Sequence, residues 1–240
     1  MQTLAPRSGP AEAEGPVRPR RPPVEVAHAR GLSYRAGLER MEQAVDRAKA
    51  GGIETLLLFE HPPVLTLGRA ADRGHVLAAP ELLEGLGIEV VATGRGGDVT
   101  YHGPGQLVGY PVLSLSPDRR DVYRYVRDLE EVLLRTLSDF GIGGARVARR
   151  TGIWVRRAGA GPERKIAAIG VRISRWVSSH GFALNLDPDL AHFNWIVPCG
   201  IADAGVTSMR EQLGQAPAWP AVERSVVRHL AEVFEREIAA

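Results

Sequence analysis

One thiol and one amine are the residues best suited to covalent chemistry in this chain. Cys199 is the only cysteine, and it lies between Pro198 and Gly200, where a turn can expose a nucleophile. Lys165 is one of only two lysines in a chain whose other cations are arginines. A lone cysteine is most often a small, inert filler of an apolar core. The pattern alone therefore leaves both a packing role and a catalytic role open for Cys199.

A catalytic cysteine needs a base or a cation beside it, because the thiolate is the form that attacks. Histidine is the usual partner, and the sequence offers His61, His102, His180 and His192. Lys165 is the alternative. It begins an extended stretch in which every second residue is apolar, so its ammonium either reaches water at a sheet margin or is desolvated. Desolvation would lower its pKa and make it a base, although the pattern alone favours the sheet margin.

Residues 94–111 form a glycine-rich stretch that contains six glycines. Glycines let backbone N–H groups approach a ligand closely, and Arg95 and His102 supply polar groups at the two ends of the predicted loop. The stretch contains neither G-x-G-x-x-G before a helix nor G-x-x-x-x-G-K-[ST], so it does not predict a nucleotide site. By itself it is typical of a turn between two strands.

Length and composition describe an ordinary globular chain. It has 240 residues, 44% of them hydrophobic and 24% charged, and a net charge of +2, which does not by itself indicate nucleic-acid binding. The single cysteine excludes an internal disulfide and a cysteine-based zinc site. Since no apolar run reaches about 18 residues and no signal peptide is apparent, we expect a cytoplasmic protein.

The hydrophobic pattern predicts an α+β fold, a mixed sheet with helices on one side. Residues 1–23 lack large apolar side chains, so we expect a disordered extension there and a single domain over 24–240. We expect helices at 33–50, 80–86, 121–140 and 221–238. Ser33 should cap the first of these helices and Asp121 the third. We expect strands at 24–29, 54–59, 63–67, 88–93, 106–115, 153–156, 165–173 and 177–186.

Several separated motifs resemble those of the octanoyltransferases of lipoate biosynthesis. Within the glycine-rich stretch, the matching residues are Arg95-Gly96-Gly97, Thr100, His102, Gly105-Gln106 and Tyr110-Pro111. Three further matches are the segment 165–170 that begins with Lys165, the segment 179–185, and Pro198-Cys199-Gly200. The E-H-x-x-V-x-T-x-G pattern from Glu60 is also similar, with His61 either a substrate contact or a turn histidine bonded to backbone. The resemblance covers roughly residues 54–205.

The resemblance implies an acyltransferase with the sheet fold of the biotin and lipoate ligases. It implies a dyad of Cys199 as nucleophile and Lys165 as base, and a substrate pocket lined by the glycine loop and two strands. The implied pocket residues are Arg95, Gly96, Gly97, Asp98, Val99, Thr100, Tyr101, His102, Ala168, Ile169, Gly170, Gly181, Phe182 and Ala183. Neither a cofactor nor a metal is implied.

The implied donor is octanoyl-acyl carrier protein. The implied acceptors are lysines on the lipoyl domains of 2-oxoacid dehydrogenases and on the glycine cleavage H protein. We expect a monomer with no nucleic-acid or membrane partner. Two alternatives remain: an ATP-dependent lipoate-protein ligase, which needs no thiol such as Cys199, and a basic protein that binds RNA or an acidic partner. The arginines are scattered rather than clustered with aromatic residues, which argues against the second alternative.

Overall fold

The computed structural model describes residues 21–156, 162–197 and 205–239. Its strands are β1 (Val24–Ala29), β2 (Glu54–Phe59), β3 (Val64–Leu67), β4 (Glu89–Ala92), β5 (Val99–His102), β6 (Gln106–Val112), β7 (Gly144–Val147), β8 (Arg150–Val155), β9 (Arg164–Ser174) and β10 (Val177–Asn185). Its helices are α1 (Tyr34–Lys49), α2 (Pro80–Gly85), α3 (Val122–Asp139), α4 (Met209–Leu213), α5 (Trp219–Phe234) and the 3₁₀ turns η1 (Arg73–His75) and η2 (Leu190–Trp195). The predicted α+β class with a mixed sheet is confirmed.

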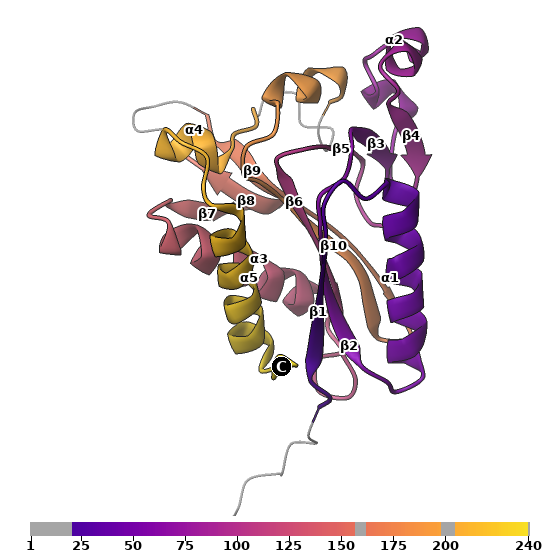
Figure 1. Cartoon of the computed structure of the whole chain (residues 1–240), viewed down its shortest axis with the longest axis vertical. Coiled ribbons are helices and arrows are strands. Elements are labelled where there is room, and N and C mark those ends of the chain that lie inside the picture. Colours follow the sequence, from indigo (N-terminus) through magenta and orange to yellow (C-terminus); the bar gives the residue numbers. More distant parts are fainter. Residues whose placement is uncertain (1–20, 157–161, 198–204, 240) are drawn as a thin grey trace, which may run out of the picture.

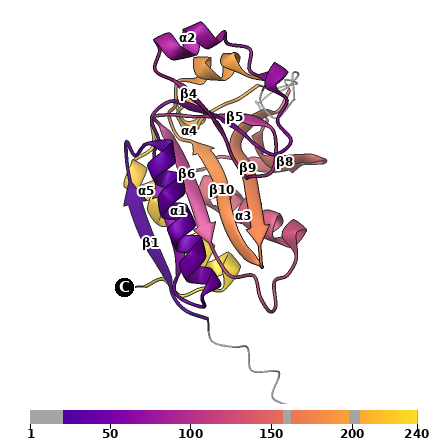
Figure 2. The same cartoon turned by 90° about the vertical axis from the view of Figure 1, so that its right-hand side faces the viewer.

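The strands form two sheets (Figure 1). A seven-stranded sheet has the order β1-β2-β6-β10-β9-β8-β7, and a three-stranded sheet has the order β4-β3-β5. In the large sheet β1 and β2 are parallel and the other neighbours are antiparallel. The small sheet lies beyond one end of the large sheet, close to where β9 and β10 carry two of the predicted pocket segments (Figure 2).

Helices cover both faces of the large sheet, so the expectation of helices on one side is wrong (Figure 1). Leu56 and Leu58 of β2 pack in the cluster that includes α3 and α5, whereas Leu57 and Phe59 pack with α1. Successive side chains of a strand point to opposite faces, and all six residues of β2 are buried. The apolar residues of β2 follow one another directly, whereas a strand with one face in water alternates polar and apolar residues. This sequence feature indicates that both faces of β2 are covered.

The helix starts follow the predicted caps, but the last helix ends early. Ser33 and Asp121 accept hydrogen bonds from the backbone N–H groups of the first turns of α1 and α3. Helix α5 was predicted to reach Ile238, but it stops at Phe234 because the next residue, Glu235, has a left-handed φ of 53°. Ile238 instead bridges Val24 at the edge of β1. The amphipathic spacing extends past the helix because Ile238 is partly buried in another conformation.

A strand lies inside the stretch that was predicted to be a loop between strands. Strand β5 pairs antiparallel with β3, from Val64 opposite His102 to Leu67 opposite Val99. Val99, Thr100 and Tyr101 are residue types that favour strands. Because the glycines on either side are typical of a loop, this strand was not predicted. Val99 and Tyr101 pack into a small apolar core with α2 and η2. Thr100 and His102 point to the opposite face of β5.

The described chain begins inside the segment that was predicted to be an extension. Arg21 donates a hydrogen bond of 2.6 Å to the carbonyl of Ser114 and pairs with Asp118. Residues 1–20 lie outside the described residues, so of the predicted extension over 1–23 the structure describes only its last three residues. Within the described part of the chain, no helix combines the length and the apolar character needed to cross a bilayer.

Candidate active site

A small cavity lies between the glycine loop and strands β9 and β10. Its volume is about 50 Å³. Every residue predicted to bind substrate, except Tyr101, lines it: Arg95, Gly96, Gly97, Asp98, Val99, Thr100, His102, Ala168, Ile169, Gly170, Gly181, Phe182 and Ala183. On the two strands, Gly170 is paired with Gly181, and Ala168 with Ala183. Three sequence-distant segments therefore meet at one point.

Glycines allow the loop to lie against β9. The N–H of Gly96 donates a 2.9 Å hydrogen bond to the carbonyl of Val171, which fixes the loop over the strand. A Cβ on Gly170 would lie 2.9 Å from the carbonyl oxygen of Gly96 and 3.2 Å from Cδ of Arg95. Real Cβ atoms essentially never come that close to backbone, so a larger residue would push the loop away from β9.

Arg95 forms a wall of the cavity and is held by the small sheet. It is buried, and its guanidinium donates to the carbonyl and to Oγ1 of Thr66 at 2.7 and 2.8 Å. A third bond of 3.1 Å goes to the carbonyl of Gly96. The charge is therefore solvated by backbone and hydroxyl oxygens, as a buried cation requires.

His102 lines the cavity as a neutral side chain. Its Nδ1 lies 2.7 Å from Oε1 of Gln106. Burial, reinforced by the neighbouring His61, lowers the pKa of His102 to about 3. A base whose pKa lies far below the working pH accepts protons poorly. This environment disfavours His102 as the general base.

His61 and His180 are also buried, and neither has the environment of a base active near neutral pH. Nδ1 of His61 lies 2.8 Å from the carbonyl of Leu32, so this side chain is the backbone-bonded turn histidine. Burial lowers its pKa. Burial, followed by the charges of Arg95 and Arg172, lowers the pKa of His180 to about 4. His180 also has a left-handed φ of 54°.

Tyr101 and His192 lie on the other face of β5. The hydroxyl of Tyr101 is 2.7 Å from Nδ1 of His192, and its ring packs edge-on against Phe193 and Trp195. Because side chains alternate along a strand, Tyr101 faces away from the cavity that its neighbours Thr100 and His102 line. The prediction placed Tyr101 in the pocket because it follows the contiguous motif, whereas the strand turns it outward.

Lys165 is buried, which corrects the margin position favoured by the strand pattern. Its exposed fraction is 7%, and its Nζ lies 4.7 Å from the centroid of the Trp154 ring. The face of an indole ring attracts a cationic group, so the contact with Trp154 fixes the position of this amine. The backbone of Lys165 pairs with the next segment, since its N–H donates to Gly205 and its carbonyl accepts from Thr207, both at 2.9 Å.

Cys199 lies outside the described residues, but both ends of the stretch that contains it are held. Val197 donates a 2.8 Å hydrogen bond to the carbonyl of His75, and Gly205 is bonded to Lys165. Nδ1 of His75 lies 2.5 Å from Oδ2 of Asp98, which lines the cavity. His75 was not predicted from the sequence, because it belongs to no recognised motif. It reaches the cavity beside Asp98 only through the pairing of η1 with the end of η2.

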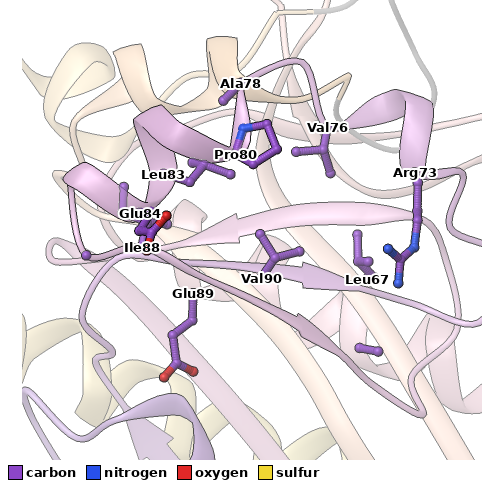
Figure 3. Close-up of a pocket in the computed structure, with 12 residues that line it drawn as sticks. Leu67, Arg73, Val76, Ala78, Pro80, Leu83, Glu84, Ile88, Glu89 and Val90 are labelled. Atoms are coloured by element: carbon purple, nitrogen blue, oxygen red, sulfur yellow. The ribbon is translucent and has the colours of Figure 1, made fainter.

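A larger cavity of about 680 Å³ lies over the small sheet (Figure 3). Leu67, Val76, Pro80 and Leu83 supply an apolar lining, with charged groups from Arg73 and from α2 and β4 among the lining residues. Among its described lining residues there is no nucleophile paired with a base. Among the described residues, no three or more His, Asp or Glu side chains are grouped to bind a metal ion.

The fold and a family model place the chain in one class. Residues 33–231 match the model of the lipoyl protein ligase A/B catalytic domain. The fold is similar to that of a bi-partite lipoate protein ligase from Thermoplasma acidophilum, with a TM-score of 0.69, 17% identity, and coverage of 91% of this chain and 86% of that one. Lipoate-protein ligase A bound with ATP gives a TM-score of 0.69 at 15% identity, with coverage of 92% and 88%. At these identities the likeness establishes the fold alone.

Relatives with a higher sequence identity show which family within this class the chain belongs to. The chain is 48% identical to an octanoyltransferase from Acidobacterium capsulatum over 90% of this chain and 92% of that protein. It is 50% identical to one from Chloroflexus aurantiacus over 86% and 92%, and 49% identical to one from Myxococcus xanthus, of which it covers 58%. The chain belongs to the octanoyltransferase family and is an acyltransferase, which confirms the predicted resemblance and enzyme class.

Proposed function

We propose that this protein transfers an octanoyl group from octanoyl-acyl carrier protein to a lysine of lipoyl domains, through a thioester on Cys199. The observation that carries the proposal is the buried amine of Lys165, on a strand whose backbone is bonded to the segment that follows Cys199. Burying an ammonium costs free energy that a partner group must offset, and a cation beside a thiol promotes the reactive thiolate.

The described residues on either side of Cys199 are anchored near the cavity. Val197, two residues before Cys199 in the sequence, donates a hydrogen bond to the carbonyl of His75. His75 contacts Asp98, and Asp98 lines the cavity. The segment returns to Lys165 at Gly205. These anchors of the flanking residues support the proposal that Cys199 is the nucleophile.

The first half-reaction forms the acyl-enzyme. The proton of the Cys199 thiol moves toward the amine of Lys165, and the thiolate attacks the thioester carbonyl of the donor. The carbon–sulfur bond to the carrier breaks, and the carrier thiol leaves with a proton. One thioester replaces another, so no ATP is consumed. The amine of Lys165 lies over the ring of Trp154, and this contact holds the base in place for both half-reactions.

The second half-reaction forms the amide. The incoming lysine is cationic in water and must lose a proton before it attacks, so Lys165 accepts that proton once it has protonated the leaving carrier thiolate. The new carbon–nitrogen bond displaces Cys199 as a thiolate, and the second proton that the nitrogen loses on becoming an amide passes to water. The glycine loop presents its backbone to the reacting carbonyl, and Gly170 allows that loop to lie against β9 at the cavity.

A lipoate-protein ligase is the second candidate, because the fold is shared with such enzymes. Relatives at 48–50% identity over most of both chains are octanoyltransferases, which favours transfer from a thioester.

The test mixes the protein and an apo lipoyl domain with either octanoyl-acyl carrier protein or free octanoate and ATP. We expect amide formation from the carrier protein without ATP, and none from free octanoate. Modification only in the arm with octanoate and ATP would overturn the proposal in favour of a ligase. The Cys199→Ser variant is the control in both arms, because a ligase would keep its activity without the thiol.

A further inference from the structure

Five polar side chains behind the cavity form one continuous chain of hydrogen bonds. It begins at Arg95, whose Nη2 donates to Oγ1 of Thr66 at 2.8 Å. Thr66 Oγ1 is 3.5 Å from Nε2 of His102, and Nδ1 of His102 is 2.7 Å from Oε1 of Gln106. Gln106 donates to Oδ1 of Asn185 at 2.9 Å. Asn185 in turn donates to the carbonyl of Thr207 at 2.9 Å.

The direction of every bond is fixed from one end by a carbonyl. The carbonyl of Thr207 can only accept, so the amide nitrogen of Asn185 faces it and its oxygen faces Gln106. Gln106 must then donate to Asn185, and it donates also to the carbonyl of Tyr101 at 3.3 Å. Its oxygen is left for His102, whose Nδ1 must therefore carry the proton.

The other end of the chain requires the same direction. The guanidinium of Arg95 can only donate, so Thr66 Oγ1 accepts from it and keeps its own proton to give to Nε2 of His102. With the proton on Nδ1, Nε2 of His102 carries the lone pair that receives it. The donors thus run one way from a cation to a carbonyl, an arrangement in which each bond polarises the next.

This chain of hydrogen bonds connects parts of the site that are far apart in the sequence. Thr66 belongs to β3, His102 to β5, and Gln106 and Asn185 are register partners on β6 and β10. Thr207 follows the segment that contains Cys199, and its N–H is bonded to the carbonyl of Lys165. The residues of this hydrogen-bond chain are at most 7% exposed, so water cannot replace a lost bond.

We propose that Gln106 and Asn185 are positioning residues of the acyl site. They hold His102 with its proton on Nδ1, and they connect Arg95, which lines the cavity, to Thr207, whose N–H is bonded to the carbonyl of Lys165. The inference rests on the proposed function. In this arrangement both ring nitrogens of His102 are committed to hydrogen bonds, so His102 is a fixed link between the two sheets rather than the proton acceptor of the transfer.

The test reads the His102 tautomer by long-range proton–nitrogen NMR of imidazole-labelled protein at pH 7. The parent should show a neutral ring protonated on Nδ1. In Gln106→Met the acceptor for Nδ1 is gone, so the proton should move to Nε2 and face Thr66, and turnover should fall about tenfold, the equivalent of one buried hydrogen bond. Asn185→Asp still accepts from Gln106, so it should keep the tautomer but lose turnover because its carboxylate faces the Thr207 carbonyl.

The matched control is Ser178→Ala. Ser178 is fully buried on the same strand β10 and hydrogen-bonded to the backbone of Pro111 and Leu113, outside the chain. This variant should change neither the His102 tautomer nor, beyond about threefold, the turnover at equal folded fraction.

Three results would overturn the proposal: a parent His102 protonated on Nε2, a Gln106→Met protein whose tautomer stays on Nδ1, or one whose tautomer moves while turnover stays at the parent value. If Gln106→Met does not fold, the parent tautomer and Asn185→Asp still decide. The NMR measurement needs no substrate. A parent with the expected tautomer but no octanoyl transfer would therefore refute the proposed function and not the hydrogen-bond chain.

Discussion

Mild acid should destabilise this protein through its buried histidines. The pKa of His102 is lowered to about 3 and that of His180 to about 4, in both cases chiefly by burial. In the unfolded chain both titrate near 6.5. Between those values the unfolded state binds more protons than the folded state, so the free energy of unfolding falls as the pH falls below about 6.5.

The size of the effect follows from these values. Between pH 7 and pH 5 each of these histidines goes from about one quarter to almost fully protonated in the unfolded chain, while the folded state stays nearly neutral, which costs about 2 kcal/mol per residue. His102 and His180 together should therefore remove about 4 kcal/mol of stability, or roughly 10 °C of melting temperature. Since most unfolded-state carboxylates titrate near pH 4, this window reports mainly on histidines.

Urea unfolding at pH 7, 6 and 5 measures the effect, with His180→Asn as the matched variant. Asparagine tolerates the left-handed backbone of His180, φ 54°, and removes only the titrating ring. Its loss of stability between pH 7 and pH 5 should be about 2 kcal/mol smaller than that of the parent. Equal stability of the parent at both pH values, or an undiminished pH dependence in His180→Asn, would refute the account of a neutral buried histidine cluster.

Three further predictions concern the cavity, the dyad and the terminus. Gly170→Ala should reduce transfer at least tenfold, because its Cβ would meet a loop carbonyl at 2.9 Å, whereas Gly85→Ala, with nothing within 4 Å, should transfer at the parent rate; equal rates would show that the loop does not shape the site. Lys165→Arg should keep a reactive Cys199 toward iodoacetamide yet fail in transfer, and Lys165→Ala should lose both; parent-like alkylation and turnover in Lys165→Ala would remove that lysine from the mechanism. Deleting residues 1–20 should leave melting temperature and transfer unchanged, and a melting temperature lower by many degrees would show that this segment docks.

The sequence predicted most elements because their local signals agree with the fold. Ser33 and Asp121 mark helix starts through their own side chains, and the apolar residues of β2 between Leu56 and Phe59 predict a buried strand. Strand β5 was missed, since a short strand between glycines has little local signal and is stabilised by pairing with β3. The amphipathic pattern of α5 does not predict that the helix ends at Glu235, whose backbone is left-handed.

The site was predicted only as far as motifs are contiguous. Segments of β9, β10 and the glycine loop were each recognisable, and the structure brings them to one cavity. Three features could not be foreseen, because each depends on packing: Trp154 lies against Lys165, His75 is tied to Val197, and Tyr101 turns to the far face of its strand. Periodicity places a side chain on a face but does not say what covers that face.

The most direct test of the central claim is the intact mass of the protein after brief mixing with octanoyl-acyl carrier protein, in the absence of acceptor. The account predicts one added octanoyl group on the peptide that contains Cys199, removed by hydroxylamine as a thioester must be, and lost on addition of an apo lipoyl domain that gains the same mass. The Cys199→Ser protein should acquire no hydroxylamine-labile group. Transfer at the parent rate by Cys199→Ser, or parent transfer with no acylated Cys199 at any time of mixing, would contradict the covalent mechanism.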